Sequence, residues 1–260
     1  MSELRDIKIS GSGDISGGEY NNVRISGSGD ILGDLICNEL VISGSGDCNG
    51  KVRAKKIKIS GSGDIYKDAY AEEEIIGDGS CEFKGNVNSK RVKLRGSGDV
   101  LGDITAEEVE LSGSCDVKGN VKFDSMSIRG SADIYGDCEG RIFSSIGSGD
   151  IKGLLSADEI NIDLTHSKYI KEIGGEKINV VEASKNIYLG FKLFKRESIL
   201  TSEIIEGDEI NLENTTCKIV RGKDVIIGKN CSIDKVEYTG EIIIDKSSEI
   251  KEVIDLTKNK

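Results

Sequence analysis

The stretch Ser43-Gly44-Ser45-Gly46-Asp47, followed by Ser60-Gly61-Ser62-Gly63-Asp64, belongs to a motif that repeats along the first 150 residues. Nine copies end on an acidic residue, and the intervals between successive acidic residues are 16, 17, 17, 18, 17, 17, 17 and 17. The nine acidic residues are Asp14, Asp30, Asp47, Asp64, Glu82, Asp99, Asp116, Asp133 and Asp150. A fixed period of this length is typical of a solenoid, and it is shorter than the period of about 33 residues that a helix-pair repeat needs.

Apolar residues stand at fixed positions around each acidic residue. The residue seven before it and the residue one after it are apolar in all nine copies, as Ile57 and Ile65 are around Asp64. Between the motifs, apolar and charged residues alternate, which is the period of a half-buried strand. Stacked turns would bury each apolar column under its equivalent, about 4.8 Å away. The sequence therefore predicts an all-β, single-stranded parallel β-helix with about 17 residues per turn.

The two parts of the chain differ in regularity. We predict a regular β-helix with Ser-Gly-Ser-Gly-Asp turns over residues 1–165, and an irregular continuation of the same fold over 166–260. Paired apolar residues recur through the second part. The pairs are Ile160/Ile162, Ile178/Val180, Ile210/Leu212, Val225/Ile227 and Ile242/Ile244. A flap is expected to interrupt this continuation at about 185–200.

Composition argues against several functions. The chain has 46 acidic and 35 basic residues and a net charge of -11, whereas a nucleic-acid partner calls for clustered cations. Its Gly-rich loops lack the Gly-x-x-x-x-Gly-Lys-Ser/Thr string of a nucleotide-binding loop. His166 is the one histidine, and the seven cysteines form no Cys-x-x-Cys pair. We therefore expect no enzyme activity, no catalytic or metal site, and neither a cofactor nor a nucleotide.

The column of acidic residues has two readings. Carboxylates about 4.8 Å apart repel one another, and calcium could relieve that repulsion. Aspartate also accepts backbone N–H groups in turns, and we favour this explanation because it needs no metal. The cysteines take apolar or small positions: Cys37, Cys48 and Cys138 each replace an inward residue of the repeat, so we expect them to be buried.

The repeated turns, together with Ile204 to Ile210 and the segments Val220-Arg221-Gly222-Lys223 and Val225-Ile226-Ile227-Gly228, resemble the bactofilins. More narrowly, the chain resembles their polymer-forming members in Gram-positive bacteria. The resemblance implies a right-handed parallel β-helix that assembles end to end without nucleotide. It also implies a scaffolding role in cell shape, motility or envelope organisation. A cytoplasmic location is expected because the first residues lack a secretory leader. A membrane surface and envelope proteins are further expected partners.

The segment from Lys185 to Arg196 contains four cations and no anion. Aromatic residues combined with cations are typical of a segment that contacts a membrane interface. We predict instead that the segment is a flap that folds over the β-helix, and membrane contact and a lateral contact between filaments are the alternatives. The side chains expected to make the contact are Leu189, Phe191, Lys192, Phe194, Lys195 and Arg196.

The two ends of a β-helix present unpaired backbone groups over an apolar interior. Here the regular apolar pattern begins at Ile7 and Ile9 and continues to Ile250, Val253 and Ile254. We therefore predict that these five residues form the contacts of a homopolymer. One alternative is a hexapeptide-like acyltransferase, which the string from Ile227 to Ile233 faintly resembles. Another is a surface, adhesin-like β-helix.

Overall fold

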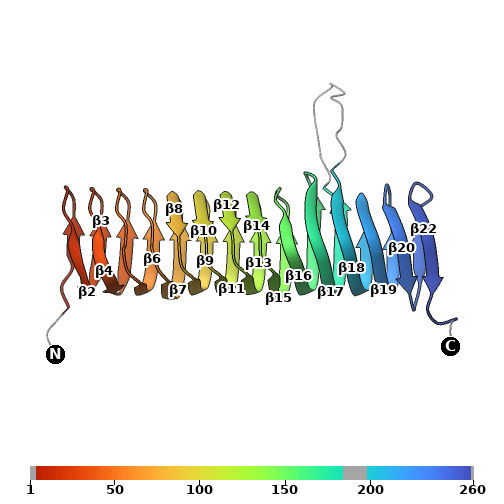
Figure 1. Cartoon of the computed structure of the whole chain (residues 1–260), viewed down its shortest axis with the longest axis horizontal. Helices are drawn as coiled ribbons and strands as arrows, with labels where there is room; N and C mark the ends of the chain where they lie inside the picture. Colours follow the sequence, from red (N-terminus) through yellow and green to blue (C-terminus); the bar gives the residue numbers. More distant parts are fainter. Residues whose placement is uncertain (1–3, 184–197, 259–260) are drawn as a thin grey trace, which may run out of the picture. The chain divides into compact units, whose positions relative to one another are not determined.

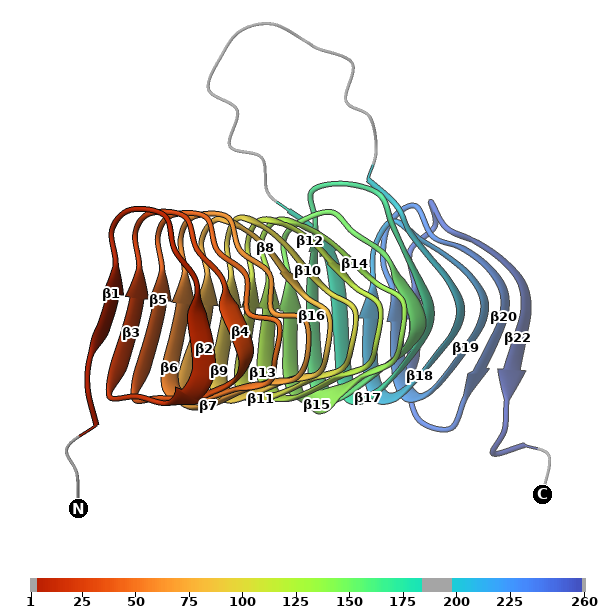
Figure 2. The same cartoon turned by 60° about the vertical axis from the view of Figure 1, so that its left-hand side comes forward.

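The computed structural model describes residues 4–183 and 198–258. It consists of two compact units, Met1–Gly136 and Asp137–Lys260, which are described separately. Every regular element in the described residues is a β-strand, as Figures 1 and 2 show. None of these residues forms a helix long and apolar enough to cross a membrane. The prediction of an all-β fold is confirmed.

The first unit is a coil of short parallel strands. Its strands are β1 (Ile7–Ile9), β2 (Ile15–Glu19), β3 (Asn22–Ile25), β4 (Ile31–Ile36), β5 (Glu39–Ile42), β6 (Val52–Ile59), β7 (Ala69–Gly77), β8 (Ser80–Phe83), β9 (Val87–Leu94), β10 (Ser97–Val100), β11 (Ile104–Leu111), β12 (Ser114–Val117), β13 (Val121–Ile128) and β14 (Ser131–Ile134).

Strand pairing in this unit follows the 17-residue period. One apolar column is paired in parallel register from turn to turn. It runs Ile7, Val23, Leu40, Ile57, Ile75, Val92, Val109 and Met126. All members after Ile7 are at most 2% exposed, so the column forms the core. The predicted parallel stacking and its register are therefore confirmed.

Each regular turn has three sides, and burial marks the corners between them. In β9 the inward residues alternate until Lys90 and Arg91, which are both exposed, and the alternation then resumes. A second corner is the Ser-Gly motif. There Gly61 lies so close to the preceding turn that a Cβ atom on it would lie 2.0 Å from the Gly44 carbonyl oxygen. Close backbone approach therefore explains why this corner requires glycine.

The second unit has longer strands. They are β15 (Cys138–Ser145), β16 (Ile151–Leu164), β17 (Lys168–Glu182), β18 (Leu200–Leu212), β19 (Thr215–Ile227), β20 (Ser232–Tyr238), β21 (Ile242–Ile244) and β22 (Glu249–Asp255). They also pair in parallel, β15 with β16 and so on to β19, which pairs with both β20 and β21. The unit has the same parallel-strand architecture. Its strands are longer because β16 to β19 run through the corner that separates strands such as β10 and β11 in the first unit, while they still end at the position of the Ser-Gly corner.

Candidate functional site

The first turn of the first unit has an unpaired strand edge. Among the described residues, β1 pairs only with β3, and β2 pairs only with β4. Ile7 and Ile9 are half-buried, whereas their partners Val23 and Ile25 are fully buried. The partial exposure of these two isoleucines arises because no described strand covers them. The predicted contact residues Ile7 and Ile9 lie on this open edge.

The last turn of the second unit also has a strand edge that no described strand pairs. Strand β22 pairs only with β20 within the described residues, and β21 pairs only with β19. Val253 is 44% exposed, whereas Val236 directly beneath it is 0% exposed. Ile250 and Ile254 on the same strand are half-buried. The predicted contact residues at this end thus also lie on an open edge.

Sequence reasoning did not select two further residues of this end. Ile244 is 41% exposed although its partner Ile227 is fully buried, and Leu256 beyond β22 is 37% exposed. Ile244 could have been identified, because it lies 17 residues after Ile227 in the same apolar column. At each of the two ends, apolar side chains lie beside backbone N–H and C=O groups that no described strand pairs, and a further strand can complete this arrangement.

Glycine at the first Ser-Gly corner is not explained by packing within the chain. A Cβ atom on Gly27 would lie 2.0 Å from the Gly11 carbonyl oxygen, so Gly27 must be glycine. A Cβ atom on Gly11 would have nothing within 4 Å. The first turn therefore retains the residue that permits another backbone to approach closely, on the side where the described residues place none.

The acidic residues of the motif bind the backbone of the next turn. The Asp47 carboxylate accepts the N–H of Asp64 at 2.9 Å, and the Asp64 carboxylate accepts the N–H of Glu82 at 3.1 Å. Burial, together with the charge of Asp47, raises the pKa of Asp64, while the N–H bond from Glu82 opposes this shift. The predicted acceptor role is confirmed.

The same corner was the candidate for a metal site. It forms an open groove of about 910 Å³ lined by serine, glycine and acidic residues between Ser12 and Ser97. Within the described part of the chain, no three His, Cys, Asp or Glu side chains are grouped so that they could hold a metal ion. The acidic side chains of this groove accept backbone N–H groups, as Asp47 and Asp64 do.

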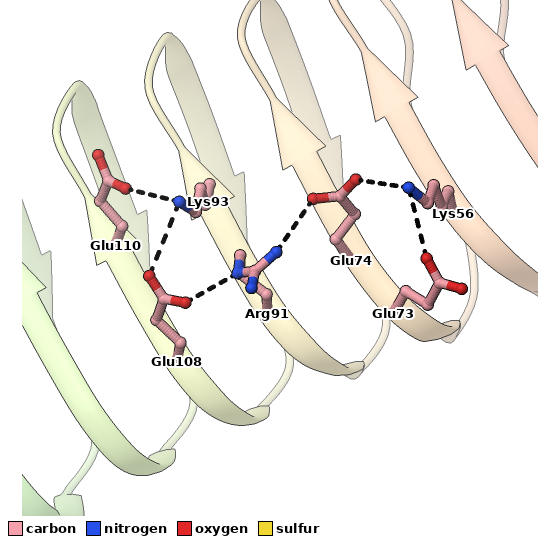
Figure 3. A network of polar contacts seen from close by, with 7 residues as sticks. All are labelled: Lys56, Glu73, Glu74, Arg91, Lys93, Glu108 and Glu110. Carbon is pink, nitrogen blue, oxygen red and sulfur yellow. Dashed lines mark hydrogen bonds and ion pairs between the residues drawn. The ribbon is translucent and has the colours of Figure 1, made fainter.

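A network of ion pairs runs across four turns of the first unit, and Figure 3 shows its side chains in successive strands. Its members are Lys56, Glu73, Glu74, Arg91, Lys93, Glu108 and Glu110. Arg91 bridges two turns, with Nη1 3.5 Å from Glu74 Oε2 and Nε 2.8 Å from Glu108 Oε2. The Glu108 pKa is lowered chiefly by its hydrogen bond from Arg91. Sequence reasoning missed this network, although the sign of the charge alternates between turns at these positions.

The cysteines are buried thiols. All seven are free and buried, which confirms the prediction for Cys37, Cys48 and Cys138 and extends it to the other four. Burial raises the pKa of Cys37, Cys81 and Cys138 to about 12, so these thiols remain protonated at neutral pH. His166 lies exposed at the bend between β16 and β17. Its exposed position differs from that of a base that activates a buried thiol, because such a base must lie within hydrogen-bond distance of the sulfur.

One buried cation was not anticipated. Lys168 is 5% exposed, and its Nζ donates to the Ser145 Oγ at 2.6 Å. Burial lowers the Lys168 pKa to about 8, against the opposing influence of Asp150 and Asp163. The sequence carries a signal for this lysine. Lys168 stands one residue before the position aligned with Asp150, and the residue just before the acidic one is Gly, Cys or Ala in the regular turns.

The predicted flap contacts Leu189, Phe191, Lys192, Phe194, Lys195 and Arg196 lie outside the described residues.

Comparison with known proteins bears on these surfaces. Residues 63–139 match the family model of the bactofilins, described as polymer-forming cytoskeletal proteins. The chain is also similar to two uncharacterized proteins of Bacillus subtilis (strain 168). It is 39% identical to YhbF over 95 residues, which cover 36% of this chain and 38% of YhbF. It is 41% identical to YhbE over 83 residues, which cover 32% of this chain and 34% of YhbE.

These matches cover only part of each protein. The chain aligns with little more than a third of the length of the two Bacillus relatives. No solved structure matches the chain. The matched residues 63–139 contain four of the nine repeated corners, those that end at Glu82, Asp99, Asp116 and Asp133, and all of the ion-pair network except Lys56. Residues 63–139 are therefore similar to the bactofilins, a family of polymer-forming cytoskeletal proteins.

Proposed function

We propose that this protein is a structural subunit that assembles end to end into filaments without nucleotide, as a scaffold for cell shape, motility or envelope organisation. The observation that carries the proposal is the pair of open strand edges, where Ile7 is half-buried and Val253 is exposed although their columns are otherwise buried. Strand pairing between copies would satisfy the backbone groups and cover these columns. The polymer-forming character of the family supports the same conclusion.

Each end of the β-helix can be tested by its own substitution. Burial of an isoleucine side chain contributes about 1.5–3 kcal/mol, and a lysine in its place would also be a buried charge. Ile7→Lys and Ile250→Lys should therefore each raise the concentration needed for assembly by at least about tenfold. Sedimentation of the purified full chain over a concentration series measures this shift. Ile36→Lys is the matched control, because Ile36 is 46% exposed on β4 and belongs to an outward position.

A glycine substitution separates folding from assembly. Gly11→Ala places a methyl group where nothing lies within 4 Å in the single chain, so the fold should keep its unfolding midpoint. In a filament the same methyl group would obstruct the approach of the next backbone. Normal sedimentation of both Gly11→Ala and Ile7→Lys would contradict a role for the first turn. Reduced sedimentation of Ile36→Lys to the same degree would show that the effect of lysine is not confined to the ends.

A further inference from the structure

Four successive turns of the first unit carry charge of alternating sign at one corner. The corner residues are Lys55 in β6, Glu72 in β7, Lys90 in β9 and Glu107 in β11. We refer to these four as the corner row. Strand register places them in successive turns, because Ala54 pairs with Ala71, Ala71 with Ser89, and Ser89 with Ala106; β7 has one extra residue at this corner, Glu73, which pairs with Lys56 in the ion-pair network. The row therefore reads plus, minus, plus, minus, with about 4.8 Å between turns.

The corner row is free of partners, unlike the ion-pair network beside it. All four side chains are exposed, and within the described residues none takes part in an ion pair or a side-chain hydrogen bond. The next residues along three of these strands, Lys56, Arg91 and Glu108, form ion pairs with residues of neighbouring turns (Figure 3). The network thus holds the turns in register, whereas the corner row leaves its charges available to another molecule.

The order of signs determines which partner fits. Two copies laid side by side in the same direction and without stagger would oppose like charges at every position. Turned by a two-fold axis, the row is complementary to itself: Lys55 meets Glu107 of the second copy, and Glu72 meets Lys90. A contact of this kind is isologous, so each pair occurs twice. A parallel arrangement staggered by one turn would form only three pairs.

We propose that the corner row is a lateral, antiparallel contact between two copies of this chain. Exposed ion pairs are individually weak and are screened by salt. In filaments the contact would recur with every subunit, and many linked weak contacts act together. The proposal extends the proposed function, because its effect on filaments depends on end-to-end assembly. It assigns antiparallel pairing of neighbouring filaments to residues that serve no ion pair within the chain.

The test uses zero-length carbodiimide cross-linking of a mixture of isotopically light and heavy full-length chains. Lys55 and Glu107 are three turns, about 14 Å, apart within one copy, so an amide between them can form only between copies. We expect light–heavy cross-links joining Lys55 to Glu107 and Lys90 to Glu72, with yields that fall at high salt. The same samples are scored for filaments and filament pairs by electron microscopy.

Charge-reversal variants provide the decisive part of this cross-linking experiment. Lys55→Glu and Glu107→Lys should each reduce the Lys90–Glu72 cross-link between copies several-fold, because each opposes like charges in the two-fold contact. The combined variant restores complementarity in the antiparallel arrangement and should recover the yield. Lys67→Glu is the matched control, since Lys67 is exposed in the same unit and forms no ion pair among the described residues.

The outcomes separate the alternatives. In a parallel arrangement staggered by one turn, the combined variant would bring like charges together at two positions and would not recover the cross-link yield. If the native chain gives Lys55–Glu72 cross-links between copies and the combined variant fails to recover the yield, the antiparallel contact is overturned. Filaments without any light–heavy cross-link at the row would overturn lateral pairing and leave end-to-end assembly intact. Light–heavy Lys55–Glu107 cross-links without filaments would support the lateral contact and contradict the proposed function. An equal loss in Lys67→Glu would overturn the assignment to the corner row.

Discussion

At the scale of single residues, Lys168 is a cation buried in the core. Its pKa is lowered to about 8 by burial, whereas an unfolded lysine titrates near 10.5. Between these values the unfolded chain binds more protons than the folded chain, so stability should rise with pH across this window. At pH 7 the penalty is on the order of 3 kcal/mol. We predict that Lys168→Met stabilises the protein at pH 7.

The pH dependence tests this reading of Lys168. Urea unfolding midpoints should be higher for Lys168→Met than for the native chain at pH 7, and the advantage should shrink as pH approaches 10. Ser145→Ala controls for the hydroxyl that accepts from Lys168, because it removes that partner without removing the charge. An advantage of equal size at both pH values would show that packing, and not the buried charge, is responsible.

At the scale of the turn, the acidic ladder joins each corner to the next. Asp47→Ala removes the acceptor of the Asp64 N–H and leaves that group without its partner, at a cost of about 1–2 kcal/mol. Asp47→Asn keeps an acceptor oxygen and should lose much less. Unfolding midpoints of the two variants measure the difference. A chelator should leave both midpoints unchanged; a lower midpoint with chelator would contradict a purely backbone role.

The turn is also the scale at which the sequence was most informative. The recurrence of Asp47 and Asp64 with Ile57 between them was sufficient to predict the period, the parallel register and the buried column. Sequence alone did not predict the corner at Lys90, because two consecutive exposed charges resemble an ordinary polar stretch. Lys168 was missed for a physical reason: its burial depends on the Ser145 hydroxyl at the end of β15, 23 residues earlier, and a local sequence pattern does not predict that contact.

At the scale of the whole molecule, the end residues were predicted from the first and last members of the apolar columns. The structure adds the contrast between Val253 and the buried Val236 below it, and the vacant side of Gly11. The lateral contact could not be predicted from composition, because a net charge of -11 says nothing about the order in which the signs alternate along the corner row. Assembly in two directions would then use different chemistry, strand pairing along the filament and ion pairs between filaments.

The central claim is that open strand edges drive end-to-end assembly. Negative-stain electron microscopy of the purified full chain, in buffer without nucleotide, metal or other ligand, tests it most directly. We predict unbranched filaments, with the concentration needed to form them raised by the Ile7→Lys substitution and unchanged by the Ile36→Lys substitution. A field of monodisperse single particles at tens of micromolar native chain would contradict the claim.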